Sequence, residues 1–225
     1  MREGWKEAAR LIDISAVRTH HTEADVRETV RIAKEYGFIN VHSLPCFTKL
    51  VSTLLKDEPD IYTGAPVGFP SGGHRTELKV EEARRLVEDG VEEMDVVMNV
   101  GLFRSGGDEL VLDELNRVLA AAPEGVKTKV IIEINALSDE EMLRACRLVM
   151  QTKADFIKTG TGWIPGGANI ERIAMIKRET TGHIKVKAAG GIRTTEEFLQ
   201  LRELGVERFG INLKSALEIV ADERL

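Results

Sequence analysis

Strand-length apolar runs recur eight times along this chain of 225 residues, and a segment with helical spacing of its apolar residues separates each run from the next. The runs cover residues 11–15, 38–44, 66–70, 94–99, 129–134, 156–160, 184–190 and 208–212. Strands that alternate with helices pair in parallel, and eight strand–helix units in about this length predict a closed (β/α)8 barrel, the TIM barrel of the α/β class. We expect one barrel domain over residues 1–225, with a short helix at its amino-terminal end.

Residues that commonly start helices support this division. Thr22, Ser138 and Thr194 each precede a helical segment, and acidic residues follow in the first turn, where the positive end of the helix dipole favours them. The three caps follow the first, fifth and seventh apolar runs, as a strict alternation of strands and helices requires.

The charge and composition of the chain exclude several partners. Its 31 basic and 37 acidic residues give a formal charge of −6, and no basic run is interleaved with aromatic residues, so we expect no nucleic acid partner. No apolar stretch is long enough to span a bilayer, and no cleavable leader is visible, so we expect no membrane partner and a cytoplasmic location. Cys46 and Cys146 are far apart and are predicted to be free thiols.

The histidines do not predict a metal site. His20, His21, His42 and His74 lack the spacing of a metal-binding motif, and no carboxylate stands at a ligand-like spacing from them. We interpret them as surface or loop residues and expect no bound metal.

Two lysines carry the strongest chemical signal. Lys158 lies in Asp-Phe-Ile-Lys-Thr-Gly-Thr-Gly and Lys187 in Lys-Val-Lys-Ala-Ala-Gly-Gly, each near the end of a predicted strand, so both are expected in one pocket. At about 4 Å and an effective dielectric of about 20, two ammonium groups repel by about 4 kcal/mol, equivalent to roughly three pKa units. A neutral amine attacks carbonyl groups, so the pair predicts Schiff-base chemistry. The alternative is that either lysine is a paired core charge or reaches solvent.

Strand alternation predicts which side chains enter the barrel. The apolar alternates of the fifth, seventh and fourth runs leave Glu133, Lys185, Lys187 and Asp95 pointing inward. Because buried charges need partners, we expect Asp95 and Glu133 to be the counter-ions of the inward lysines.

These motifs together resemble the deoxyribose-phosphate aldolase family, a family of Schiff-base-forming aldolases, over almost the whole chain. The matching segments are Phe-Ile-Lys-Thr-Gly-Thr-Gly at 156–162, Val-Lys-Ala-Ala-Gly-Gly-Ile-Arg-Thr at 186–194, Glu-Met-Asp-Val-Val-Met-Asn at 93–99, Val-Gly-Phe-Pro at 67–70 and Lys-Val-Ile-Ile-Glu at 129–133. The resemblance implies a lyase that reversibly cleaves 2-deoxy-D-ribose 5-phosphate to acetaldehyde and D-glyceraldehyde 3-phosphate, without metal or cofactor. It implies that Lys158 forms the Schiff base, that Lys187 keeps its amine partly neutral, and that Asp95 moves protons through a water.

The expected substrate contacts lie at strand ends. Glycines there allow backbone amides to approach an anion, although tight turns alone also select glycine. The residues expected to bind substrate are Ser15, Thr161, Gly162, Gly190, Gly191, Gly210 and Asn212.

Several residues depart from the family pattern near the substrate. Ile211, Asn212 and Leu213 stand where the family usually has a pair of phosphate-binding serines, and Trp163 stands where relatives carry a lysine or a smaller residue. Arg18 is near a usual lysine. Two alternatives therefore stay open: a lysine-dependent aldolase for a non-phosphorylated or carboxylate-bearing deoxy or keto sugar, and a non-catalytic barrel that binds a sugar phosphate. The expected partners are small aldehydes and sugar phosphates, with a possible homodimer.

Overall fold

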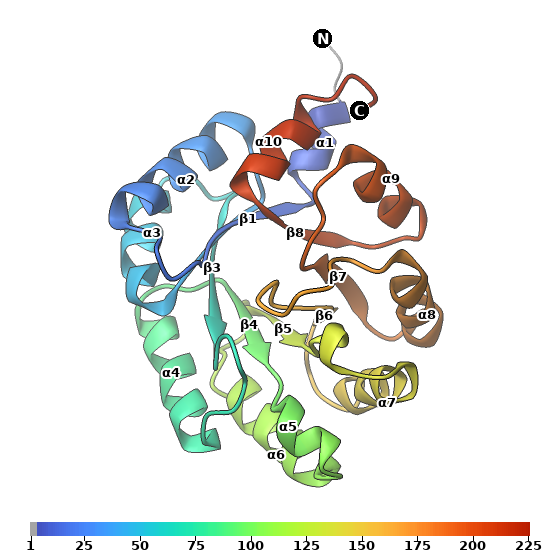
Figure 1. The fold of residues 1–225 in the computed structure, drawn as a ribbon. Helices are drawn as coiled ribbons and strands as arrows, with labels where there is room; N and C mark the ends of the chain where they lie inside the picture. Colours follow the sequence, from blue (N-terminus) through green and yellow to red (C-terminus); the bar gives the residue numbers. More distant parts are fainter. Residues whose placement is uncertain (1–3) are drawn as a thin grey trace.

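Eight parallel strands close into a barrel in the order in which they occur along the chain, β1 to β8, as the alternation of the sequence predicts (Figure 1). The structure is a computed structural model that describes residues 4–225, so the first three residues of the predicted domain lie outside the described residues. The strands are β1 (Ile12–Ala16), β2 (Asn40–Ser43), β3 (Tyr62–Val67), β4 (Glu93–Val97), β5 (Lys127–Ile131), β6 (Phe156–Lys158), β7 (Lys185–Ala189) and β8 (Arg208–Asn212). The barrel closes between β1 and β8, where Ile12 lies opposite Phe209.

Helices form a ring outside the strands (Figure 1). They are α1 (Gly4–Ala9), α2 (Glu23–Tyr36), α3 (Thr48–Leu55), α4 (Thr76–Glu88), α5 (Val100–Arg104), α6 (Asp108–Leu119), α7 (Asp139–Val149), α8 (Ile170–Thr180), α9 (Thr195–Glu203) and α10 (Leu213–Val220). Two 3-10 turns, η1 (Pro45–Phe47) and η2 (Ile134–Ala136), follow β2 and β5. The first helix, α1, contacts the last helix, α10, so the first and last described helices lie side by side.

The predicted helix caps are present. Thr22, Ser138 and Thr194 each accept a hydrogen bond from the backbone N–H three residues later, and the acidic residue at that position accepts one from the N–H of the cap. These capping boxes satisfy backbone groups that a helix start leaves free, and each is worth about 1 kcal/mol.

The predicted third and fifth strands differ most from the strands of the structure. The third strand spans Tyr62–Val67 rather than residues 66–70, because Gly68 adopts a φ of 68° and turns the chain out of the sheet. The fifth strand ends at Ile131, and Glu133, two residues later, has a φ of 54°. Local backbone conformation therefore ends both strands before the apolar run ends.

The layer between strands and helices is apolar, as the alternation predicts. Val130, Ile157, Val186 and Ala188 are fully buried there. None of the helices formed by residues 4–225 has the length and apolar character needed to cross a bilayer.

One ion pair is buried in the helix layer. Lys79 of α4 and Glu114 of α6 are 2.6 Å apart, and the side-chain exposures are 0% and 3%. The Lys79 ammonium also donates to the carbonyl of Val97 at the end of β4, 2.9 Å away. This pair ties two helices to the strand that carries Asp95.

Candidate active site

Lys158 and Lys187 meet on one carboxylate. They come from the adjacent strands β6 and β7, where they lie directly opposite each other in register. Both ammonium groups donate to Oδ2 of Asp95 on β4, each at 2.8 Å. The structure thus brings together the three residues that the sequence predicts for the reacting centre.

The barrel interior holds further charges below this group. Lys129 on β5 lies 3.0 Å from Oδ1 of Asp95 and 2.6 Å from Glu93. Arg208 on β8 bridges Asp13, at 2.7 Å, and Glu93, at 2.9 Å. Asp13 in turn lies 2.5 Å from the Lys187 ammonium. The strands therefore direct four buried cations toward three buried carboxylates.

Lys158 is the cation best able to lose its proton. Burial lowers its pKa most, Asp95 raises it, and Lys187 lowers it again, which leaves a pKa of about 8. For Lys129, the nearby carboxylates outweigh burial, and its pKa is raised instead. The Lys158 side chain is also 10% exposed, whereas those of Lys187 and Lys129 are 1% and 0% exposed. A partly neutral and reachable amine is what a nucleophile requires.

Burial rather than repulsion is thus the larger cause of the lowered pKa of Lys158. Repulsion from Lys187 also lowers the pKa of Lys158, as predicted, but its effect is smaller than that of burial. Asp95, close to three lysines, keeps a pKa well below its usual value although burial alone would raise it.

Two of the predicted inward charges do not belong to this cluster. Glu133 holds the loop after β6: its carboxylate accepts hydrogen bonds from the backbone N–H and the hydroxyl of Thr161. Burial raises the pKa of Glu133. It is Asp13, not Glu133, that joins Asp95 as a carboxylate partner of Lys187. Lys185 has the predicted parity but is exposed at the start of β7, over the ring of Phe156.

The interpretation of His42 as a surface or loop residue is wrong. His42 lies on β2, is 3% exposed, and places Nε2 3.3 Å from Oδ2 of Asp95. His42 lies two residues after Asn40 on the short strand β2, so both side chains point to the same face, and both are buried inside the barrel. This spacing is the sequence signal that could have placed His42 inward. Asp13 on β1, Glu93 on β4 and Arg208 on β8 were not predicted as members of the buried cluster either.

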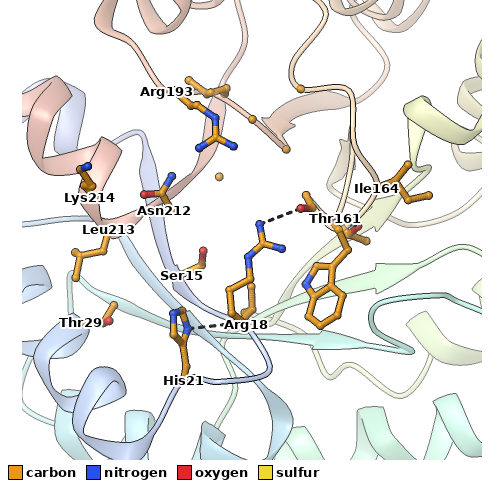
Figure 2. A pocket seen from close by; sticks show the side chains of 18 of the residues that line it. Ser15, Arg18, His21, Thr29, Thr161, Ile164, Arg193, Asn212, Leu213 and Lys214 are labelled. Carbon is orange, nitrogen blue, oxygen red and sulfur yellow. Dashed lines mark hydrogen bonds between the residues drawn. The ribbon is translucent and has the colours of Figure 1, made fainter.

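The residues expected to bind substrate line one pocket of about 970 Å³ at the carboxyl ends of the strands. Those that line it are Ser15, Thr161, Gly162, Gly190, Gly191, Gly210 and Asn212. Arg193 after β7 and Lys214 in α10 also line it, and sequence reasoning had not selected either. Figure 2 shows Arg193, Asn212 and Lys214 around one part of the cavity and Arg18 across its middle.

Several of these residues have local tasks as well. The Asn212 side chain caps α10 by accepting from the N–H of Ser215 at 3.0 Å. A Cβ on Gly210 would lie 2.9 Å from Cβ of Ala189 and 3.3 Å from Cε of Lys187, so glycine at this position leaves room for both side chains. Gly191 has a φ of 102°, and a Cβ there would lie 2.4 Å from Cα of Gly167. Only glycine fits at such a close approach.

A bridge crosses the mouth of the pocket. The Arg18 guanidinium donates to the carbonyl of Gly162 at 3.0 Å and lies 5.8 Å from the ring centroid of Trp163. Trp163 in turn packs edge-on against Phe69, with ring centroids 5.7 Å apart. Two departures from the family pattern, Arg18 and Trp163, therefore contact each other in the lining of this pocket; Figure 2 shows Arg18 there.

Among residues 4–225, no group of three or more histidine, cysteine or acidic side chains is placed to hold a metal ion. Cys146 is buried and burial raises its pKa to about 12, while Cys46 is exposed; both are free thiols.

The closed barrel and the buried lysines at its strand ends are typical of a (β/α)8-barrel enzyme of the aldolase class. The chain belongs to the DeoC/LacD family of aldolases, whose family model matches residues 9–206.

Curated relatives and solved structures agree with this assignment. The chain is 45% identical over 216 residues to a deoxyribose-phosphate aldolase of Sinorhizobium medicae, covering 96% of this chain and 86% of that protein. It is 42% identical over 225 residues to that of Klebsiella pneumoniae subsp. pneumoniae, covering 99% and 90%. A tetrameric deoxyribose phosphate aldolase from Aeropyrum pernix superposes with a TM-score of 0.87 at 28% identity, over 96% of this chain and 91% of the other.

Proposed function

We propose that this protein reversibly cleaves 2-deoxy-D-ribose 5-phosphate to acetaldehyde and D-glyceraldehyde 3-phosphate through a Schiff base on Lys158. The observation that carries the proposal is the Lys158 amine, with a pKa of about 8 and 2.8 Å from Asp95, which it shares with Lys187. The activity for which these relatives are named supports the same substrate for this chain.

In the direction of synthesis, neutral Lys158 attacks the carbonyl carbon of acetaldehyde, and the resulting carbinolamine loses water to give an iminium. Loss of a proton from the methyl carbon sends its electron pair into the iminium, which forms an enamine. The enamine carbon then bonds to the aldehyde carbon of the acceptor, whose oxygen takes a proton. Water finally releases Lys158. Asp95 is positioned to take part in these proton transfers, because it contacts the amine directly.

We assign the acceptor phosphate to the side of the pocket where Arg193 and Lys214 lie. Gly190 and Gly191 line the same cavity, and α10 begins at Leu213, which also lines it, so the positive end of the helix dipole lies at the cavity. Two cations and this helix start replace the hydroxyls that a pair of serines would supply, so phosphate affinity does not need those hydroxyls.

A related aldolase that uses a non-phosphorylated or carboxylate-bearing sugar is the second candidate. It is favoured by Leu213 at the start of α10 and by Trp163, which is 37% exposed beside Arg18 at the pocket mouth. A non-catalytic barrel is the third, and the lowered pKa of Lys158 argues against it.

Borohydride reduction with acetaldehyde, followed by a comparison of substrates, separates the three. We expect a fixed mass on the peptide that contains Lys158, and a much higher kcat/KM for deoxyribose 5-phosphate than for deoxyribose. Equal use of the free sugar would favour the second candidate, and the absence of any label on Lys158 would favour the third.

We also propose a homodimer in the cytoplasm. Leu78 of α4 and Leu110 of α6 are 59% and 63% exposed on helices that pack side by side, which supports an interface there. The free thiols Cys46 and Cys146 suit a reducing compartment. Light scattering of the wild type and of Leu110→Glu tests the dimer, and an unchanged mass would argue against that interface.

A further inference from the structure

His42 is held in one orientation by residues of three strands. Its Nδ1 lies 2.8 Å from Oδ1 of Asn40, and Asn40 donates to Glu93 at 3.2 Å. Because the Asn40 amide nitrogen already donates to Glu93, its oxygen faces the imidazole and must accept from Nδ1–H. A Cβ on Gly64 would lie 2.1 Å from Nδ1, so the glycine on β3 leaves room for the ring.

This tautomer leaves Nε2 without a proton. The atom is buried and makes no hydrogen bond among the described residues, yet it lies 3.3 Å from Oδ2 of Asp95. That oxygen is also the one that accepts from Lys158 and Lys187. A single carboxylate oxygen, Oδ2 of Asp95, therefore lies between the lone pair on Nε2 of His42 and the amine of Lys158.

Charges on six other strands surround the ring. Asp95 and Glu93 come from β4, Lys129 from β5 and Lys158 from β6, and Lys187, Asp13 and Arg208 complete the cluster from β7, β1 and β8. Burial lowers the pKa of His42 well below 6.5, Asp95 partly opposes this, and the three lysines lower it further. The imidazole is thus neutral at pH 7 while Lys158 is charged.

We propose that His42 is a positioning residue of the proton relay, which takes up, through Asp95, the proton that Lys158 must lose and returns it when the carbinolamine loses water. This inference rests on the proposed Schiff-base function and adds a residue to it. In the first transfer, an N–H bond of the Lys158 ammonium breaks, its electron pair stays on Nζ, and an N–H bond forms at Nε2 of His42. In the return step, the N–H bond at Nε2 breaks and its proton bonds to the hydroxyl oxygen of the carbinolamine. The C–O bond then breaks to release water, and the iminium carries the positive charge.

The charge balance of the buried cluster supports the relay. Moving a proton from Lys158 to His42 leaves the total charge of the cluster unchanged, so no new net charge is created in a medium of low dielectric. Once Lys158 is neutral, one of the cations that lower the pKa of His42 is gone, and protonated His42 forms an ion pair with Asp95.

His42→Gln tests the relay, because a glutamine amide can donate to Asp95 but cannot take up a proton. We expect borohydride trapping of acetaldehyde on Lys158 to slow by about 10²-fold or more, the usual range for a lost acid–base group, with little change in KM for the acceptor. His183→Gln, at the exposed turn before β7, is the matched control and should trap at the wild-type rate. Asn40→Ala should give a smaller loss, because the ring can then adopt either tautomer.

NMR titration of the imidazole in Lys158→Met keeps His42 itself intact, so it remains decisive if His42→Gln does not fold. The titration midpoint of His42 should rise when the neighbouring cation is removed. An unmoved midpoint, or wild-type trapping by folded His42→Gln, would overturn the relay. If the wild type takes no label on Lys158, the Schiff-base function itself is wrong. Normal wild-type labelling with an unaffected His42→Gln variant refutes the relay alone.

Discussion

Replacing Lys187 by methionine should raise the pKa of Lys158. Both ammonium groups lie 2.8 Å from Oδ2 of Asp95, so the two nitrogens are separated by at most twice that distance, and ~4 Å is a representative value within this limit. At an effective dielectric of about 20, their repulsion is about 4 kcal/mol, or roughly three pKa units. Asp95 would then pair more closely with Lys158, which acts in the same direction. Burial and the charge of Lys129 would still lower the pKa of Lys158.

The consequence for activity follows from the fraction of neutral amine. With a pKa of about 8, about a tenth of Lys158 is neutral at pH 7. A rise of roughly three units would leave about one part in ten thousand, so the trapping rate at pH 7 should fall by up to about 10³-fold. At a pH above the new pKa, the rate should recover.

The assay is rapid-quench borohydride trapping with acetaldehyde across the alkaline range. The variant should still fold, because Asp13 keeps Arg208 at 2.7 Å and Asp95 keeps Lys129 at 3.0 Å. Lys187→Arg retains the positive charge and is the control, with a midpoint close to that of the wild type. If Lys187→Met also keeps its midpoint near pH 8, burial alone sets the pKa of Lys158 and the repulsion argument fails.

Three further predictions concern stability. The folded state lowers the pKa of Lys158 from 10.5 to about 8. Below pH 8 the charged side chain therefore lowers the free energy of unfolding by about 3 kcal/mol, and this loss disappears as the pH rises toward 10.5. Lys158→Met should therefore be more stable than the wild type in urea at pH 7 but not at pH 10, and a difference that stays constant with pH would contradict this. Lys79→Met should lose about 3–5 kcal/mol by leaving Glu114 buried without its partner, and the double variant with Glu114→Leu should recover most of the loss. A double variant as unstable as the single one would show that the loss comes from packing instead. Ser138→Ala should cost about 1 kcal/mol by thermal unfolding, and no change in Tm would mean that the capping box contributes nothing to α7.

The sequence predicted those parts of the site that follow from strand position. Lys158, Lys187 and Asp95 each lie near the end of a recognisable apolar run, and parallel strands of a barrel bring such positions to one place. Glu133 was placed wrongly because alternation was extended two residues past the true end of β5, where the backbone turns to a positive φ. An apolar run does not show at which residue the hydrogen bonding to the neighbouring strand stops.

His42 shows a different limit. Its burial depends on Gly64 from β3, on Asn40 from its own strand and on the carboxylate of Asp95 from β4. Apart from Asn40, these neighbours are absent from the sequence around His42, because they come together only when the barrel closes. Arg193 and Lys214 were not predicted for the same reason. Arg193 follows β7 and Lys214 lies in α10, and only the closed barrel places both beside one cavity.

The amino-acid sequence by itself determined the barrel, its helix caps and the two facing lysines, because periodicity and capping are local properties of the chain. The tertiary structure alone decided the electrostatics of the site. The pKa of Lys158 depends on its burial and on charges brought from β4, β5 and β7, and the neutrality of His42 depends on the same cluster. Such interactions act across distances in space rather than along the chain, so they exist only once the eight strands have closed.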